Sequence, residues 1–107
     1  NYARKAIEIR PDWGEPYLLI GRIYIDARSS AFPDKFDQTT VIWAAIDQFT
    51  KAKAVDPKVR DKTEGLIKSY SVLLPPAETL FYYALKKGDD YLVKSWLNEK
   101  TTVKARD

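Results

Sequence analysis

The stretch PDWGEPYLLIGRIY, from Pro11 to Tyr24, decides how this chain folds. Apolar side chains recur from Tyr17 to Tyr24 at the spacing of one helical face. Gly21 stands inside that helical pattern, although glycine costs a helix about 1 kcal/mol relative to alanine. A similar proline, Pro57, closes a later stretch, FTKAKAVDP. The glycine and the returning proline therefore need an explanation from the rest of the chain.

The composition is typical of a globular protein and excludes several kinds of chemistry. Of the 107 residues, 45% are hydrophobic and 31% are charged, which is enough apolar material for one small domain with a core. Cysteine and histidine are absent, so disulfides, thiolate nucleophiles and histidine general bases are excluded. The longest apolar run, VIWAAI, is too short to span a membrane. We therefore expect no enzyme activity, no metal and no cofactor.

The charge is unevenly placed along the chain. Residues 1–57 carry eight basic and eight acidic side chains, so the net charge of +3 lies in residues 58–107. A surplus this small is more typical of a mixed, solvated surface than of a nucleic-acid interface. Weak nucleic-acid binding stays an alternative through the basic side chains near the C-terminus, which are Lys86, Lys87, Lys94, Lys100, Lys104 and Arg106.

Helical periodicity interrupted by prolines and turn residues predicts a mainly helical chain. Helices are expected over residues 1–10, over Pro16 to about residue 27, over residues 39–55 and over residues 58–73, with Thr39 or Thr40 as the cap of the third. The segment RSSAFPDKFDQ (28–38) is typical of a loop. A short helix is expected over residues 77–87, ended by Gly88, with one of Tyr82 and Tyr83 facing outward. YLVKSWL and TVKAR predict two strands of a hairpin with a turn at NEKT, 98–101.

The spacing of key residues resembles the tetratricopeptide repeat (TPR) family. Its pattern is W-x₂-L-G-x₂-Y followed by A-x₃-F and P, over about 34 residues. The first half appears here as Tyr17, Ile20, Gly21 and Tyr24, and the second as Ala45, Phe49, Ala52 and Pro57. The resemblance implies that Gly21 lets a partner helix approach closely and that Pro57 closes the repeat. It also implies a short right-handed solenoid of antiparallel helix pairs.

The resemblance divides the chain into parts. These are TPR-like repeats over 1–88, made of a half repeat (1–11), a central repeat (12–57) and a degenerate repeat (58–88), followed by a C-terminal hairpin segment over 89–107. The 46 residues from Pro11 to Pro57 exceed the family period by about 12, which indicates an insertion at 26–40. Phe32 and Phe36 in this insertion either contact a partner or fold back to anchor the loop.

The chain opens inside an expected helix and contains no methionine, which we interpret as the C-terminal portion of a larger bacterial TPR protein. The closing segment is similar to the end of some bacterial cell-envelope TPR proteins, which favours the envelope or periplasm over the cytoplasm. The open half repeat leaves an apolar face, so a homodimer through that end is expected.

By resemblance, the first helix of each repeat lines a concave face that binds a peptide or protein segment. Carried onto this chain, the lining consists of Glu15, Leu18, Arg22, Ile25, Asp61, Glu64 and Lys68. The alternative for the charged members is simple pairing on a wet surface. The expected function is non-catalytic protein–protein interaction or scaffolding. The alternative is a purely structural C-terminal cap of a solenoid.

Overall fold

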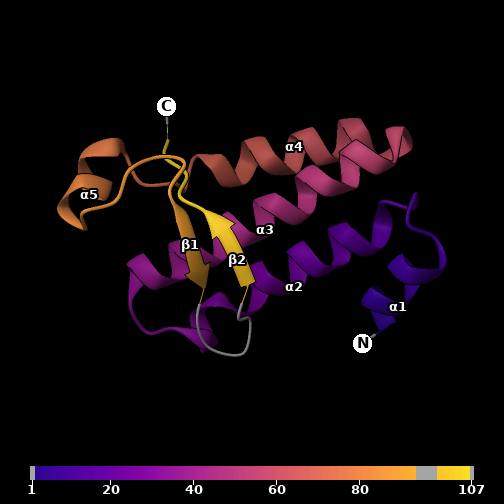
Figure 1. Ribbon diagram of the computed structural model, residues 1–107, viewed down its shortest axis with the longest axis horizontal. Helices are drawn as coiled ribbons and strands as arrows, with labels where there is room; N and C mark the ends of the chain where they lie inside the picture. The colour runs from indigo at the N-terminus through magenta and orange to yellow at the C-terminus, as the bar shows by residue number, and fades with distance from the viewer. Residues whose placement is uncertain (1, 94–98, 107) are drawn as a thin grey trace.

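A computed structural model describes residues 2–93 and 99–106 of the chain (Figure 1). Its elements, in order, are α1 (Tyr2–Ile9), α2 (Glu15–Ala31), α3 (Lys35–Val55), the 3₁₀ helix η1 (Pro57–Val59), α4 (Arg60–Ser71), α5 (Ala77–Tyr82), β1 (Asp90–Val93) and β2 (Glu99–Thr102). The described part is therefore mainly helical, as expected, with one small antiparallel sheet. The TPR solenoid itself stays a prediction.

Helix α3 is the centre of the structure. It packs against α2, α4 and both strands, while α1 packs on α2 (Figure 1). Ten of its 21 residues are buried, including Trp43 and Phe49, which have no exposed surface. Because α3 is covered on several sides, its apolar residues do not follow a single stripe. α2, α4 and the hairpin are therefore held in place by what they bury against this helix.

Local sequence sets where the long helices begin and end. Pro16 lies in the first turn of α2, where its missing N–H costs nothing. Asp56 ends α3, and its side chain accepts hydrogen bonds from the N–H of Lys58 and the N–H of Gly14, both at 3.0 Å. These two bonds hold the beginning of α2 against the end of α3. The bond from Gly14 is the main cause that lowers the pKa of the Asp56 carboxyl.

The prediction of a loop over residues 28–38 is wrong. α2 continues to Ala31 and α3 begins at Lys35, so the extra residues lengthen both helices and leave a short link. Asp34 caps α3 by accepting from the N–H of Asp37 at 3.2 Å, whereas Thr39 and Thr40 lie inside the helix. Their hydroxyls donate to carbonyls one turn earlier, which satisfies both hydroxyl groups within the helix.

The predicted end of the fifth helix, at Gly88, is also wrong. α5 stops at Tyr82, well before Gly88. Ala84 takes a left-handed backbone conformation, with φ of 59°, and the N–H of Leu85 donates to the carbonyl of Leu80 at 3.0 Å. This is the geometry of a helix C-terminus that usually has glycine at the left-handed position. Gly88 has φ of 95° in the next turn, where its N–H donates to the carbonyl of Val103.

The hairpin is confirmed, but its second strand is shifted. β2 occupies Glu99–Thr102, where a turn was expected, and pairs in antiparallel register with β1 from Asp90↔Thr102 to Val93↔Glu99. The part of the expected first strand over 94–97 lies outside the described residues. Val93 and Val103 are buried, which fixes the inward face of the hairpin.

Candidate functional site

Of the residues expected to line a concave face, Glu15, Leu18 and Arg22 border one hollow of about 250 Å³, whereas Ile25 and the three residues of α4 do not line it. Leu18 and Ile25 are 1% and 4% exposed and belong to the core, so neither is free to contact a partner. Glu15 forms an ion pair with Lys62, which links α2 directly to α4. Arg22 is exposed on α2, and Asp61, Glu64 and Lys68 are exposed on α4. Binding of a partner by these exposed charged side chains stays a prediction.

The two phenylalanines expected in an insertion loop are half-buried and pack against the core. The ring of Phe36 stacks on Tyr83, the residue after α5, with 3.8 Å between centroids, and meets Trp43 edge-on at 6.0 Å. Both rings therefore pack on the core, and contact of either with a partner stays a prediction. Phe36 in particular joins α5 to the central helix.

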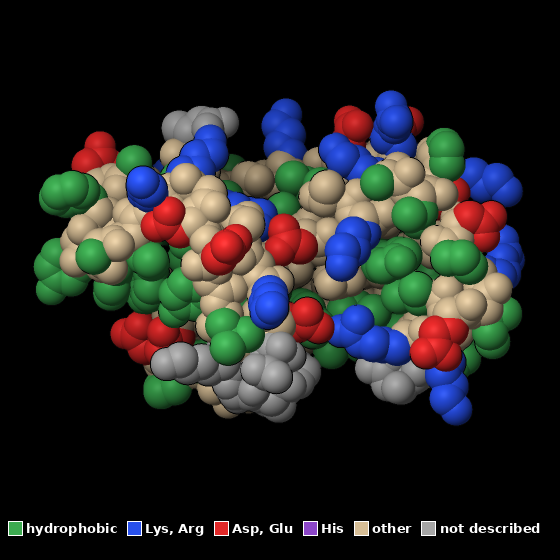
Figure 2. Space-filling view, viewed as in Figure 1, with side chains coloured by type: hydrophobic (Ala, Val, Ile, Leu, Met, Phe, Trp, Pro, Cys, Tyr) green, Lys and Arg blue, Asp and Glu red, His purple; other side chains and the backbone are tan. Residues whose placement is uncertain are grey.

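Aromatic side chains instead gather at α5, where the sequence predicted only one outward-facing tyrosine. Phe81 and Tyr82 are 85% and 84% exposed, and Tyr83 is partly exposed. We call these three residues the α5 aromatic surface. Hydrophobic side chains project at the left end of the molecule, where Figure 1 places α5 (Figure 2). Exposed aromatic groups of this size are typical of interaction sites.

A chain of rings connects this surface to the core. Tyr82 meets Tyr83 edge-on at 5.1 Å, Tyr83 stacks on Phe36, and Trp43 meets Tyr91 of β1 edge-on at 5.4 Å. Burial, and then the negative charge of Asp37, raise the pKa of Tyr91. These contacts tie Tyr83 to the core, and among the ring contacts of the described residues Tyr82 reaches the core only through Tyr83.

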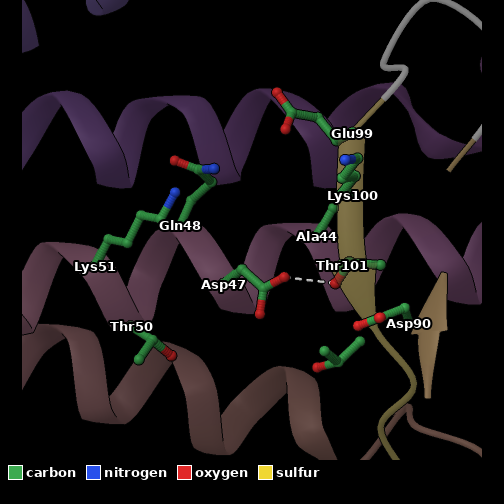
Figure 3. A pocket seen from close by; sticks show the side chains of 10 residues that line it. Ala44, Asp47, Gln48, Thr50, Lys51, Asp90, Glu99, Lys100 and Thr101 are labelled. Atoms are coloured by element: carbon green, nitrogen blue, oxygen red, sulfur yellow. Dashed lines mark hydrogen bonds between the residues drawn. The ribbon is translucent and has the colours of Figure 1, made fainter. Parts of the chain in front are cut away.

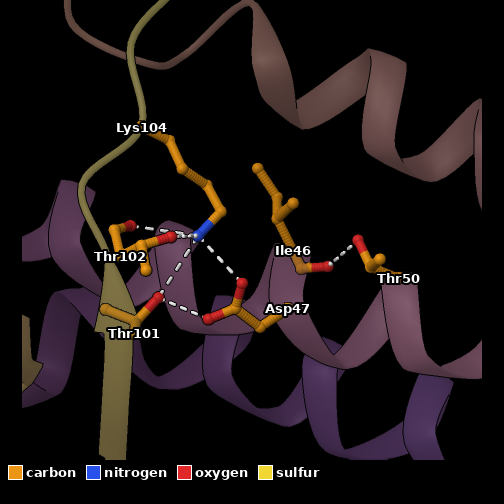
Figure 4. Close-up of polar contacts among 6 residues, drawn as sticks. All are labelled: Ile46, Asp47, Thr50, Thr101, Thr102 and Lys104. Carbon is orange, nitrogen blue, oxygen red and sulfur yellow. Dashed lines mark hydrogen bonds and ion pairs between the residues drawn. The ribbon is translucent and has the colours of Figure 1, made fainter. Parts of the chain in front are cut away.

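A second feature is a polar hollow of about 430 Å³ between α3 and β2 (Figure 3). Asp47 of α3 lies at its wall, where it accepts from the hydroxyl of Thr101 and pairs with Lys104 at 2.8 Å (Figure 4). The Lys104 ammonium also donates to the carbonyl of Thr102 at 3.0 Å. The sequence does not predict this hollow, because it depends on where the hairpin packs on α3.

Glu99, at the start of β2, links the hairpin to the first two helices. Its carboxylate pairs with Arg4 of α1 at 2.7 Å and accepts from the hydroxyl of Tyr24 of α2 at 3.0 Å. Burial, followed by the charge of Glu99, raises the pKa of Tyr24 to about 12. The hairpin is thereby attached to α1, α2 and α3 together.

The open N-terminal end also exposes apolar surface. Tyr2 and Ile9 are largely exposed and border, with Trp13, a hollow of about 330 Å³. The guanidinium of Arg10 lies 5.2 Å from the centre of the Trp13 ring. The expected homodimer through this end stays a prediction, and the hollow is where a second copy would pack.

Two further findings concern the described residues. No helix within them is long and apolar enough to cross a membrane. Across residues 2–93 and 99–106, no group of acidic side chains is arranged to hold a metal ion. Comparison of the chain with models of protein families, with curated proteins and with solved structures finds no match.

Proposed function

We propose that this chain is a non-catalytic protein-interaction module and that its main contact is the α5 aromatic surface. The observation that carries the proposal is the exposure of Phe81 and Tyr82, at 85% and 84%. Large rings that are exposed next to each other leave apolar surface in contact with water. A bound partner would bury this surface, which is favourable. Tyrosine is also enriched among the residues that contribute most to binding at protein interfaces.

The packing of Tyr83 supports this role. Tyr83 lies between Tyr82 and Phe36, and Phe36 meets the fully buried Trp43 edge-on. A ring that is already packed loses little conformational freedom when a partner binds, so more of the contact energy at Tyr83 appears as affinity. The concave face is the weaker candidate because its two apolar members, Leu18 and Ile25, are buried.

The alternatives fit this surface less well. A structural cap is expected to present a polar outer face to water, whereas α5 presents aromatic rings. Binding to single-stranded nucleic acid would use such rings together with a positively charged groove. Lys86 and Lys87 follow α5, but Glu78, Asp89 and Asp90 lie in the same segment. The acidic side chains outweigh the two lysines, so the net charge of the segment disfavours binding to phosphate groups.

The test compares capture of proteins from the lysate of the native host by three forms of the chain. These are the wild type, the double variant Phe81→Ser/Tyr82→Ser and a control, Val72→Ser/Leu73→Ser, which also removes exposed apolar groups but at the end of α4. We expect the wild type and the control to capture the same partner and the first variant to bind it about 30-fold or more weakly. Circular dichroism must show equal helicity for all three.

Equal capture by the wild type and Phe81→Ser/Tyr82→Ser would overturn the assignment of this surface. A photo-crosslinking amino acid in place of Phe81 gives a second readout that does not depend on affinity. Crosslinks to the captured partner are expected from position 81 and not from the exposed position 72.

A further inference from the structure

The backbone of β2 presents hydrogen-bonding groups on the side away from β1. The N–H of Val103 donates to the carbonyl of Asp89 at 2.8 Å, which extends the register of the ladder beyond Asp90↔Thr102. In an antiparallel pair, hydrogen-bonded and non-hydrogen-bonded residue pairs alternate. Lys100 and Thr102 therefore belong to the non-hydrogen-bonded pairs, and their N–H and C=O groups point away from β1.

Those groups border the hollow between β2 and α3. All four residues of β2 line it, and the α3 side chains that form its other wall lie on the side of β2 opposite β1 (Figure 3). Lys104 already donates to the carbonyl of Thr102 (Figure 4). Among the described residues, no hydrogen bond engages the N–H of Lys100, the C=O of Lys100 or the N–H of Thr102. Three backbone groups are thus available along one open edge.

The hollow carries a small surplus of positive charge, because two lysines and one carboxylate, that of Asp90, line it without an ion pair within the described residues. The carboxylate of Asp47 is paired with Lys104, and that of Glu99 is paired with Arg4. Neither Lys51 nor Lys100, which also line the hollow, forms an ion pair with another residue in the described part of the chain. A ligand with negative charge therefore complements this edge better than a neutral or basic ligand.

We propose that an extended, acidic peptide segment of another protein adds to β2 as a third strand. One of its residues, opposite Lys100, exchanges two backbone hydrogen bonds, and a residue two positions away accepts from the N–H of Thr102. Its carboxylates lie near Lys51 and Lys100. A second copy of this chain is a poorer occupant, because pairing β2 with β2 would bring Lys100 and Lys104 of both copies together. The inference goes beyond the proposed function, since it concerns a different surface.

The test uses a labelled, acetylated and amidated hexapeptide of alternating glutamate and valine, titrated into the whole chain and followed by fluorescence anisotropy. Two control peptides keep its length: one replaces glutamate by lysine, and one carries methyl groups on the glutamate amide nitrogens, which face β2 when the glutamate side chains lie beside Lys100. We expect binding of the first peptide only, because the second has the wrong charge and the third lacks donors for the strand edge. In parallel, the amides of Lys100 and Thr102 are expected to gain protection from hydrogen exchange.

A matched pair of variants separates charge from backbone pairing. Lys100→Gln removes the charge, whereas Lys100→Pro removes the charge and the outward N–H. Proline is tolerated there because that N–H makes no bond to β1. We expect the proline variant to bind the acidic peptide about fivefold more weakly than the glutamine variant. Proton NMR of the ring protons of Tyr91 on β1 checks that the hairpin is intact in both.

Equal affinity of the two variants would overturn strand addition, as would equal binding of the methylated peptide to the wild type. Failure of the acidic peptide to bind at all would do the same. These results leave the α5 aromatic surface untouched, and loss of partner capture by Phe81→Ser/Tyr82→Ser says nothing about β2. The two proposals can therefore fail separately.

Discussion

Gly21 of α2 lies against the ring of Phe49 of α3, so closely that a Cβ at position 21 would stand 2.5 Å from Cε1 of that ring. Two more atoms of the same ring lie within 3.0 Å of that point. Phe49 has no exposed surface, so the ring cannot turn outward to make room. The glycine that weakens α2 locally is therefore what lets the two longest helices pack.

We predict that Gly21→Ala destabilises the chain by about 1–2 kcal/mol. Overpacking a filled core costs about 1–3 kcal/mol, and the better helix propensity of alanine returns up to about 1 kcal/mol. The measurement is urea unfolding followed by circular dichroism. Gly65→Ala is the matched control, because Gly65 lies inside α4 with nothing within 4 Å of the added methyl group. It should gain about 1 kcal/mol.

If Gly21→Ala proved as stable as the wild type, the close approach of α2 and α3 would not explain the glycine. A double variant refines the result, since Phe49→Leu removes the ring that the new methyl group meets. The cost of Gly21→Ala should be smaller in that background than in the wild type, which a double-mutant cycle measures directly.

The sequence predicted much of the fold because its helix breakers are strong. Pro11, Pro57 and Pro75 separate the elements as expected, and Pro16 begins α2. The segment 28–38 was misjudged because two serines and a proline are typical of loops. Inside the structure, the hydroxyl of Ser30 donates to the carbonyl of Ala27 and α2 continues through it. Tertiary packing of the long helices outweighs these weak local preferences.

The candidate sites were less predictable. The resemblance to the TPR family assigned Leu18, Arg22 and Ile25 to one concave face, but which residues of that face are buried depends on the neighbouring elements. The exposure of Phe81 depends on where α5 ends, and Ala84 gave no sign of a left-handed turn. The hollow beside β2 depends on how the hairpin packs on α3. That packing brings together residues about 50 positions apart in the sequence, such as Asp47 and Thr101.

The contrast between Leu18 and Arg22 yields a second prediction. Leu18→Ala should cost about 2–5 kcal/mol of stability because it opens a cavity in the core. Arg22→Glu should change stability by less than about 0.5 kcal/mol, because Arg22 is exposed. Thermal unfolding of both variants checks this. Equal effects would contradict the burial of Leu18, and only Arg22→Glu is suited to probing the concave face for binding.

A third prediction concerns the turn after α5. Ala84→Gly should stabilise that turn by about 1 kcal/mol, because a left-handed conformation costs alanine roughly 1–2 kcal/mol that glycine avoids. The measurement is hydrogen exchange of the Leu85 amide, which donates to Leu80 across the turn. Exchange should slow in the variant. Faster exchange would mean that the added flexibility of glycine in the unfolded chain outweighs the relief of strain.

The last prediction concerns pH and the hydroxyl of Tyr24. Its pKa is about 12 in the folded chain and 10.0 for an ordinary tyrosine, so the folded state holds the proton more tightly. This contribution to stability is fully present below pH 10 and is lost as the pH rises from 10 to 12. Unfolding free energies measured at pH 9 and at pH 11.5 should therefore fall more steeply for the wild type than for Tyr24→Phe.

Tyr91 titrates in the same direction, since its pKa is also raised, but it is present in both proteins and cancels in the comparison. A second variant, Glu99→Gln, removes the negative charge that disfavours the tyrosinate while leaving the tyrosine in place. It should reduce the pH dependence only in part, because burial is the larger cause of the shift. Parallel slopes for the wild type and Tyr24→Phe would contradict the attachment of β2 to α2 through this hydroxyl.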